Sequence, residues 1–232
     1  MFEYENQLNM RHEYKYPLRP GEFGAIRQRC KILMQRDPHV GADGTYTIVS
    51  LYFDDAADSA LLANKSGLSH REKFRIRCYN YNKQTLHLEK KFKSGGLGTK
   101  FACPITEEEL DRIVRGDIAW TLRDERQLLA ELGLHMKNER LAPKTIVSYR
   151  REPFIYRAGN VRVTFDYDIR SGVFFTDLLN ESVPLVPAAP GLVLMEVKYD
   201  RFLPGVIQDI LQENTLRVSA FSKYAACRQF DA

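Results

Sequence analysis

The sequence has few cysteines and no spacing that would bring them together around a metal. Cys30, Cys78, Cys103 and Cys227 are scattered without any CxxC pair, so a structural zinc site is not expected. The sequence also lacks an apolar run of 18 residues and an apolar N-terminal segment of the secretory type. These absences favour a soluble, cytoplasmic protein whose thiols are small core residues.

A large excess of charge of one sign is also missing. The 232 residues include 34 Lys and Arg against 30 Asp and Glu, which gives a net charge of only +4. A protein that coats nucleic acid nonspecifically would need a stronger basic excess, so no nucleic-acid partner is expected. A hydrophobic content of 44% is typical of a globular chain, and we expect one domain over residues 1–232.

What the sequence does have is a local row of basic residues. Every second position from 71 to 77 is basic, whereas the positions between them are mostly apolar; the basic residues are Arg71, Lys73, Arg75 and Arg77. This alternation indicates a strand with two different faces, on which same-side neighbours lie about 6.7 Å apart. Like charges at that spacing repel one another, so the row is a liability unless a polyanion neutralises it. For one strand alone, an ordinary solvated face is the competing interpretation.

Four further segments repeat the one-sided arrangement. The face shared by Glu89 and Lys91 excludes Lys90, which lies on the side of Leu88 and Phe92. The four sets of same-face residues are Arg11, Glu13 and Lys15; His87, Glu89, Lys91 and Lys93; Arg162, Thr164, Asp166, Asp168 and Arg170; and Glu196, Lys198 and Asp200. Ordinary exposure to solvent would have to be assumed separately for five strands to explain why each carries its ionisable residues on one face.

A closed antiparallel β-barrel explains the pattern better. Its outer face can be apolar and covered by helices, while its interior is polar and holds a charged ligand. Strands are expected at 46–54, 71–81, 85–93, 144–156, 161–169, within 174–186 and at 192–199. Helices are expected at 20–34, at 106–114 with a Thr106–Glu109 capping box, at 122–132 ended by Gly133, and at 204–214. The predicted fold class is α+β, a closed antiparallel barrel with helices packed outside.

Seven short segments in a fixed order carry a resemblance to a known family. They are residues 11–16, 73–77, 88–91, 149–152, 161–163, 194–198 and 221–224. Together they resemble the triphosphate tunnel metalloenzymes of the CYTH-like superfamily. Within it, the chain is most similar to the polyphosphate polymerase domain of the vacuolar transporter chaperone (VTC) complex and its bacterial stand-alone relatives. None of the segments is specific alone, but the ordered set is.

The resemblance implies a set of site residues and a divalent cofactor, Mn²⁺ or Mg²⁺. The residues expected to act in catalysis are Lys15, Glu196 and Lys223. Those expected to bind the phosphates are Arg11, Arg75, Arg77, Lys91, Arg151, Arg162 and Lys198. Glu196 resembles the principal metal ligand, and Glu13 and Glu89 are further candidates.

The first strand departs from the hydrolytic branches of this superfamily, which resemble one another in an E-x-E-x-K pattern. Arg11 stands at the first of these positions, which leaves only Glu13. Replacing a carboxylate by a cation weakens a two-metal site and strengthens an anion site. This departure favours the polymerase branch.

Two questions about the site remain open in the sequence. Arg151 matches the family position, but strand parity places Arg150 on the polar face, so either a β-bulge intervenes or the match is shifted by one residue. Four other basic residues have the right parity but are expected at the tunnel mouths or in solvent; they are Arg71, Lys73, Lys93 and Arg170.

The charge pattern and the resemblance together predict a metal-dependent polyphosphate polymerase. It would transfer the terminal phosphoryl group of a nucleoside triphosphate, expected to be ATP, to a growing chain of inorganic polyphosphate. The alternatives are a hydrolase of tripolyphosphate or nucleoside triphosphates, and a polyphosphate-binding module without turnover. If the product crosses a membrane, a membrane partner protein would have to carry it, because this chain has no membrane segment.

Overall fold

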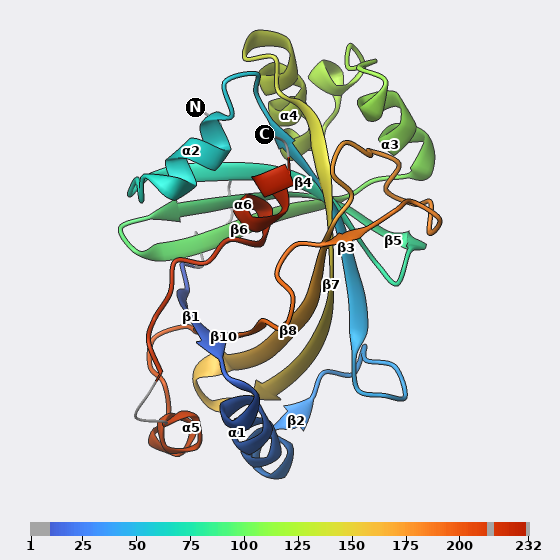
Figure 1. Cartoon of the computed structure of the whole chain (residues 1–232). Coiled ribbons are helices and arrows are strands. Elements are labelled where there is room, and N and C mark those ends of the chain that lie inside the picture. Colours follow the sequence, from blue (N-terminus) through green and yellow to red (C-terminus); the bar gives the residue numbers. More distant parts are fainter. Residues whose placement is uncertain (1–9, 213–215, 231–232) are drawn as a thin grey trace.

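A curled antiparallel sheet forms the framework of the protein (Figure 1). The computed structural model describes residues 10–212 and 216–230. Two short strands, β2 (Gln35–Arg36) and β9 (Val186–Pro187), pair with β7 and β8 at its margins. The other strands, in their spatial order, are β1 (His12–Leu18), β10 (Val193–Tyr199), β8 (Val161–Ser171), β7 (Ala142–Tyr156), β3 (Tyr46–Asp54), β4 (Arg71–Tyr79), β5 (Asn82–Ser94) and β6 (Leu97–Pro104).

The two end strands of this sheet, β1 and β6, meet at one margin. The amide of Arg11 donates to the carbonyl of Gly98 at 3.0 Å, and the amide of Gly98 returns a bond to the carbonyl of Arg11 at 3.2 Å. Within the described residues β1 and β6 form no longer ladder. The predicted α+β fold, an antiparallel barrel with external helices, is therefore confirmed, but a single bridge spans its seam and the barrel is not fully closed.

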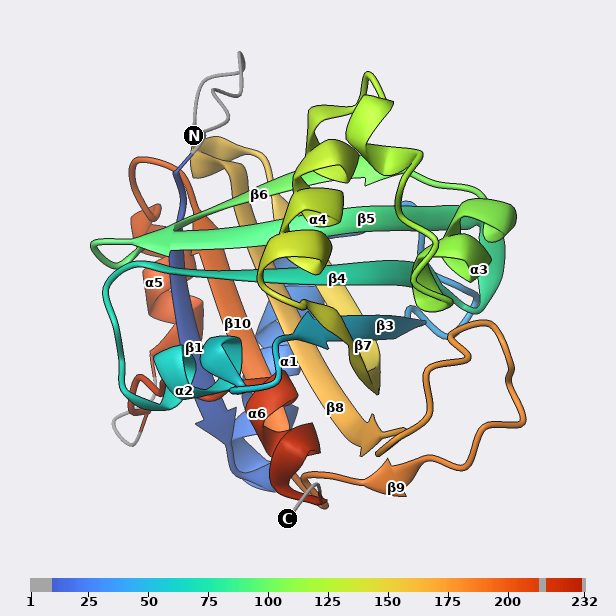
Figure 2. The ribbon, with the colours of Figure 1, turned by 90° about the horizontal axis from the view of Figure 1, so that it is seen from above.

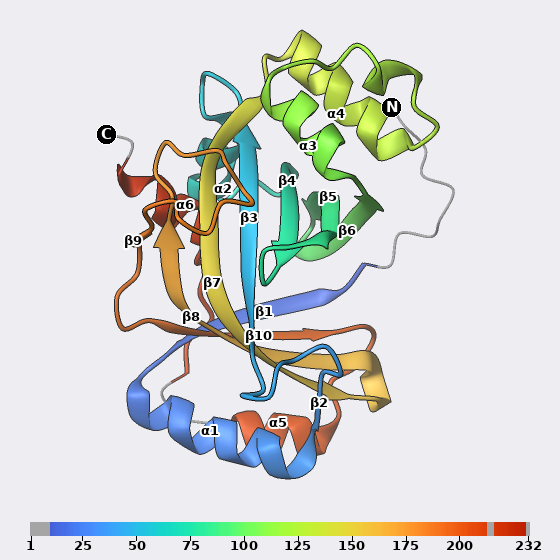
Figure 3. The same cartoon turned by 90° about the vertical axis from the view of Figure 1, so that its right-hand side faces the viewer.

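Two pairs of helices cover the apolar outer face of the sheet (Figure 3). Beneath α3 and α4, strands β3 to β5 bury Leu51, Ile76 and Leu88, and beneath α1 and α5, strands β8 and β10 bury Val163 and Met195. Each such side chain contributes about 1.5–3 kcal/mol when fully buried, which stabilises the apolar-outside arrangement. The helices are α1 (Pro20–Leu33), α2 (Ser59–Lys65), α3 (Glu107–Val114), α4 (Gln127–Asn138), α5 (Gly205–Leu211) and α6 (Lys223–Cys227). In the described parts of the chain, none is long and apolar enough to cross a bilayer.

Helix α6 and a group of apolar side chains fill part of the barrel interior. Ile48, Val147 and Ile169 pack with Tyr224 and Cys227 of α6 in one buried cluster. The hydroxyl of Tyr224 donates to the buried carboxylate of Asp54 at 2.7 Å, which attaches α6 to the end of β3. We call this cluster the α6 plug. The rest of the interior is polar.

A β-bulge in β8 interrupts the alternation predicted for this strand. Between the pairs Ser148–Arg170 and Arg150–Tyr167, β7 has one residue and β8 has two. Asp168, in the bulge, adopts a φ of 51°. As a result Asp166 and Ile169, three positions apart, are both buried, one in the polar and one in the apolar part of the interior.

The capping box predicted for α3 is present, but other predicted boundaries are wrong. The helix expected to end at Gly133 runs from Gln127 to Asn138. The segment 174–185 forms no strand, and only Val186–Pro187 pairs with β8. The helix expected at 204–214 spans Gly205–Leu211, and residue 214 lies outside the described residues.

Gly133 lies in the interior of α4 and does not end it. The position requires glycine because there is no space for a Cβ. It would lie 1.9 Å from Oγ1 of the buried Thr121. We expect Gly133→Ala to lower the free energy of unfolding by about 1–3 kcal/mol, although alanine is the better helix former. Chemical denaturation measures this change. Thr121→Ala removes the colliding hydroxyl, so Gly133→Ala should cost much less in that background; an equal cost in both would show that the collision is not the cause.

Candidate functional site

A cavity lined mostly by charged side chains lies inside the barrel. Strands β1, β3, β4, β5, β7 and β10 form its wall together with α6 and the segment before it. Ten basic side chains face only two carboxylates, Glu13 and Glu196. The basic residues are Lys15, Arg71, Lys73, Arg75, Arg77, Lys91, Lys93, Arg151, Lys198 and Lys223.

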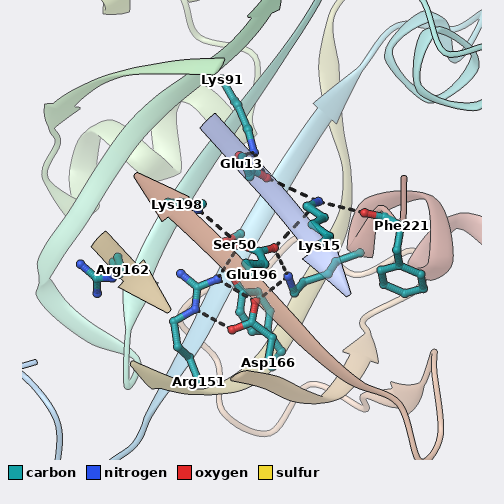
Figure 4. A network of polar contacts seen from close by, with 12 residues as sticks. Glu13, Lys15, Ser50, Lys91, Arg151, Arg162, Asp166, Glu196, Lys198 and Phe221 are labelled. Atoms are coloured by element: carbon teal, nitrogen blue, oxygen red, sulfur yellow. Dashed lines mark hydrogen bonds and ion pairs between the residues drawn. The ribbon is translucent and has the colours of Figure 1, made fainter. Parts of the chain in front are cut away.

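Lys15 lies between the two carboxylates (Figure 4). In the register of β1 and β10, Lys15 stands opposite Glu196. Glu13 stands opposite Lys198, so opposite charges alternate across the two strands. Nζ of Lys15 lies 3.7 Å from Glu13 Oε1 and 3.8 Å from Glu196 Oε1. The same ammonium group donates to the carbonyl of Phe221 at 2.9 Å, which ties β1 to the segment before α6.

Both cavity carboxylates are held in the charged form. Burial alone would raise the pKa of Glu196, but the ammonium groups of Lys223 and Lys198 outweigh it and lower the pKa well below its usual range. Burial likewise opposes the lowered pKa of Glu13, which Lys91 stabilises through two hydrogen bonds of 2.9 and 2.7 Å. A carboxylate with a strongly lowered pKa is a poor proton acceptor. Each therefore acts as a fixed negative charge.

Asp166, on β8, organises the buried side of the cavity. It accepts two hydrogen bonds from Arg151 at 2.6 and 2.7 Å and lies 2.6 Å from Nζ of Lys223. Glu196 contacts the same two cations, at 2.8 Å from Lys223 and 3.4 Å from Arg151. Burial would lower the pKa of Lys223, but these carboxylates raise it above its usual range. Two cations are thus oriented before any ligand binds.

Arg75 and Arg77, on β4, are held by hydrogen bonds from neighbouring strands. Arg75 donates to Glu89 at 2.8 Å and to the Tyr52 hydroxyl at 2.7 Å. Arg77 donates to the Tyr149 hydroxyl at 3.2 Å. These bonds fix the orientation of both guanidinium groups at the cavity wall, as expected for groups that bind phosphates.

Glu89, a predicted metal ligand, lies behind the cavity wall. Its side chain is 3% exposed and lies 2.6 Å from Arg75 and 2.7 Å from Lys100. Both of its oxygens therefore serve to compensate cations. The described residues contain no cluster of three or more acidic, His or Cys side chains suited to a metal, so Glu89 does not join Glu13 and Glu196 in such a group.

The structure decides between Arg150 and Arg151. Arg151 lines the cavity, whereas Arg150 is exposed and pairs with Asp43 at 2.5 Å. Parity indicated the wrong residue because Val147 and Tyr149, on the same face as Arg151, pack in the α6 plug. Apolar side chains on that face therefore do not mark the outside of the barrel.

Arg11 and Arg162, two of the predicted phosphate-binding residues, do not line the cavity. Arg11 pairs with Asp200 at 2.7 Å. Arg162 donates to Asp37 at 2.5 Å and to the Tyr46 hydroxyl at 2.9 Å, and Figure 4 shows it apart from the central network. Together with Glu89 they are the three of twelve predicted site residues outside the lining; the other nine surround one cavity.

Three cations expected at the tunnel mouths or in solvent also line the cavity. Arg71, Lys73 and Lys93 had the correct parity, but the sequence does not indicate how far along a strand the cavity extends. Tyr52 and Tyr149 were not predicted as site residues because aromatic side chains in a strand are usually core. Their hydroxyls nevertheless hold the two arginines of β4.

A divalent metal would find two carboxylates at this cavity. Glu13 and Glu196 both line it, on adjacent strands and on either side of Lys15. Mg²⁺ often binds through one or two carboxylates and takes its other ligands from substrate phosphates and water. This donor set fits a metal that binds together with phosphates, and it does not fit a metal held by protein ligands alone.

Comparison with known proteins agrees with this geometry. A family model described as the VTC domain matches residues 10–230. The chain belongs to the VTC domain family. The resemblance drawn from the sequence is therefore confirmed. No curated protein matches this VTC domain.

Solved structures are similar to the VTC domain at low sequence identity. A protein from Hippeastrum, described as a putative adenylyl cyclase with a dominant triphosphatase activity, is 15% identical with a TM-score of 0.56, over 95% of this chain and 96% of that one. A protein from Pyrococcus horikoshii is 13% identical with a TM-score of 0.47, over 94% and 96%. A putative adenylate cyclase from Bacillus halodurans is 14% identical with a TM-score of 0.41, over 81% of each chain. The first of these shows a common fold.

Asp166→Asn should destabilise the protein without changing its shape. Arg151 and Lys223 would keep only Glu196 as a buried counter-charge, and breaking a buried pair costs about 3–5 kcal/mol. Because the pKa of Asp166 is lowered in the folded protein, its contribution is present above the unfolded pKa and is lost as the pH falls. Denaturation at neutral pH should therefore show a larger deficit than denaturation at acid pH. A deficit independent of pH would contradict this assignment.

Proposed function

We propose that this protein is a metal-dependent polyphosphate polymerase that transfers the terminal phosphoryl group of ATP, or another nucleoside triphosphate, to a growing polyphosphate chain. The observation that carries the proposal is the cavity with ten basic side chains and two carboxylates. Membership of the VTC domain family supports it. Such an excess of cations in a shielded space suits a ligand with many closely spaced negative charges.

Phosphoryl transfer requires little covalent chemistry from the protein. Its transition state is loose and rich in charge, so catalysis depends on positioning and on electrostatic stabilisation. Arg75, Arg77 and Arg151 are already oriented by their hydrogen bonds, and Lys15 and Lys223 lie beside them in the same cavity. A divalent cation bound by Glu196 and Glu13 together with phosphate oxygens would neutralise further charge on the phosphates.

The state of the carboxylates favours transfer to a phosphate chain over transfer to water. Hydrolysis needs a base that accepts a proton from water, whereas the end of a polyphosphate chain is already anionic. Glu13 and Glu196 have strongly lowered pKa values and are engaged by ammonium groups. Neither is suited to act as that base.

Hydrolysis of a triphosphate is the second candidate function. The Hippeastrum protein of similar fold is described as having a dominant triphosphatase activity. An incubation with ATP and Mn²⁺ or Mg²⁺, resolved on a gel, separates the two. Chains longer than the substrate support the polymerase, and orthophosphate with ADP but no chains would support the hydrolase. Binding of the polyanion without formation of any product would indicate a polyphosphate-binding module without turnover.

Glu196→Gln should lower metal-dependent turnover by about 10²–10³-fold, the usual effect of losing one stabilising group in a transition state. Polyanion affinity should be retained, because the substitution removes a negative charge from the cavity. Arg150→Ala is the matched control, since Arg150 neighbours Arg151 but is exposed and points away from the cavity. Circular dichroism establishes that both variants are folded. Unchanged turnover in Glu196→Gln would remove this carboxylate from the mechanism.

A further inference from the structure

The row of cations on β4 is longer than a triphosphate needs. Arg71, Lys73, Arg75 and Arg77 all line the cavity, and they extend over six residue steps, or about 20 Å of strand. Three linked phosphates span only part of this length. A second set of phosphates could therefore contact the row at the same time.

The two halves of the row differ in how their charges are compensated. Arg75 and Arg77 each make hydrogen bonds to neighbouring side chains, and Glu89 lies 2.6 Å from Arg75 and 3.7 Å from Arg77. In the described parts of the chain the side chains of Arg71 and Lys73 have neither a hydrogen bond nor an ion pair, and the ammonium group of Lys73 lies over the ring of Tyr224, 4.8 Å from its centroid. The first half of the row is thus uncompensated by any carboxylate in direct contact, and only the more distant Asp54 attracts Lys73 among the main electrostatic influences on it.

Lys93 and Lys91 on β5 add to this uncompensated charge. Arg71 stands directly opposite Lys93, and Lys73 directly opposite Lys91. Lys93 has Glu13 as its ion-pair partner, at 3.9 Å, but Glu13 is also bound by Lys91 at 2.7 Å. Like charges directly opposite one another destabilise a sheet. The arrangement is tolerated most easily where an anion occupies the space between the strands.

The position of these residues in the barrel places them where a chain can continue into solvent. Arg71 is the first residue of β4, and Lys93 is the residue before the last of β5. The turn between β5 and β6 follows immediately, and Figure 2 shows this turn and the start of β4 at the same margin of the barrel. Lys223, Arg151 and Asp166 lie on other elements, deeper in the interior.

We propose that Arg71, Lys73 and Lys93 form a separate subsite for a linear polyphosphate, which binds phosphates of the chain beyond those held by Arg75, Arg77, Arg151 and Lys223. This subsite deepens the proposed function and rests on it for its biological meaning. Its occupant is the body of a phosphate chain and not a nucleotide. The subsite makes affinity depend on chain length, because tripolyphosphate fills the deep part alone and a long chain fills both.

Binding without metal or turnover tests the subsite. The variant is Arg71→Ala with Lys73→Ala, and the probes are tripolyphosphate and long-chain polyphosphate, with affinity measured by calorimetry over a range of salt concentrations. Long-chain affinity should fall by about tenfold or more, and its salt dependence should become shallower by about one to two units of slope for two lost contacts. Tripolyphosphate affinity should change by less than about threefold, since salt screens the more distant charges.

A control with the same loss of charge accompanies this test. Lys83→Ala with Arg115→Ala removes two exposed cations that do not line the cavity and should leave both affinities unchanged. Equal weakening of tripolyphosphate and long chains in the Arg71 and Lys73 variant would place these residues in the triphosphate site and overturn the proposal. No weakening of either would overturn it as well. Since no turnover is measured, a failure of the polymerase assay would leave this result intact.

The protonation of Lys73 provides a second measurement. Burial, with repulsion from Lys15, Arg71 and Lys91, lowers the pKa of Lys73 to about 7, although the carboxylate of Asp54 opposes this change. Tyr224 of α6 covers the same ammonium group. The amine must be protonated to bind a polyanion. Its loss of the proton should therefore weaken long-chain affinity by about tenfold between pH 6 and pH 8. This part of the pH dependence should disappear in Lys73→Ala; a pH profile identical to that of the unaltered protein would contradict contact between Lys73 and the chain.

Discussion

The repulsion between ten cations in one cavity is the constraint on which the structure depends. Water cannot screen charges there as it does at the surface, so each cation needs either a carboxylate or an anionic ligand. The protein supplies few carboxylates and shares them: Asp166 and Glu196 both serve Arg151 and Lys223, and Glu13 serves lysines of β1 and β5. Compensation is therefore complete in the deep part of the cavity and incomplete at the start of β4.

This constraint also explains why the barrel is apolar on the outside. A sheet that directs its ionisable side chains inward has only its outer face left for a hydrophobic core, and helices must cover that face. Helices α3 and α4 do so on one side, and α1 and α5 on the other. Part of the interior is nevertheless apolar, because the side chains of α6 in the α6 plug pack against apolar side chains of the strands. The same helix places Lys223 in the cavity wall. Asp54 holds this plug through Tyr224.

Alternation along the sequence was sufficient to predict the barrel and seven of the nine predicted residues that line its cavity, since period two reports which face of a strand a side chain occupies. The other two, Arg151 and Lys223, were predicted from the family resemblance alone. Alternation was insufficient where a bulge shifts the period, and where an inward face of the barrel carries apolar side chains. The bulge at Asp168 shifts the period within β8, and Tyr149 is apolar on an inward face because of the α6 plug. Glu89 and Arg162 show a further limit: an inward-facing charge can be consumed by a neighbouring strand or loop, and such pairing follows from tertiary structure alone.

The site draws on both ends of the chain, and this links its formation to folding of the whole barrel. Lys15 of β1 donates to the carbonyl of Phe221, and its own carbonyl accepts from the amide of Ser219 at 2.8 Å. Lys223 reaches Asp166 and Glu196 only once β8 and β10 have paired. Contacts of such long sequence separation form late and slowly, because loop-closure entropy must first be overcome. Until those contacts exist, the carboxylates that compensate the deep cations are not in place. Collapse of a partial barrel would then bring like charges together without their partners, so charge compensation favours an all-or-none transition in which barrel and site appear together.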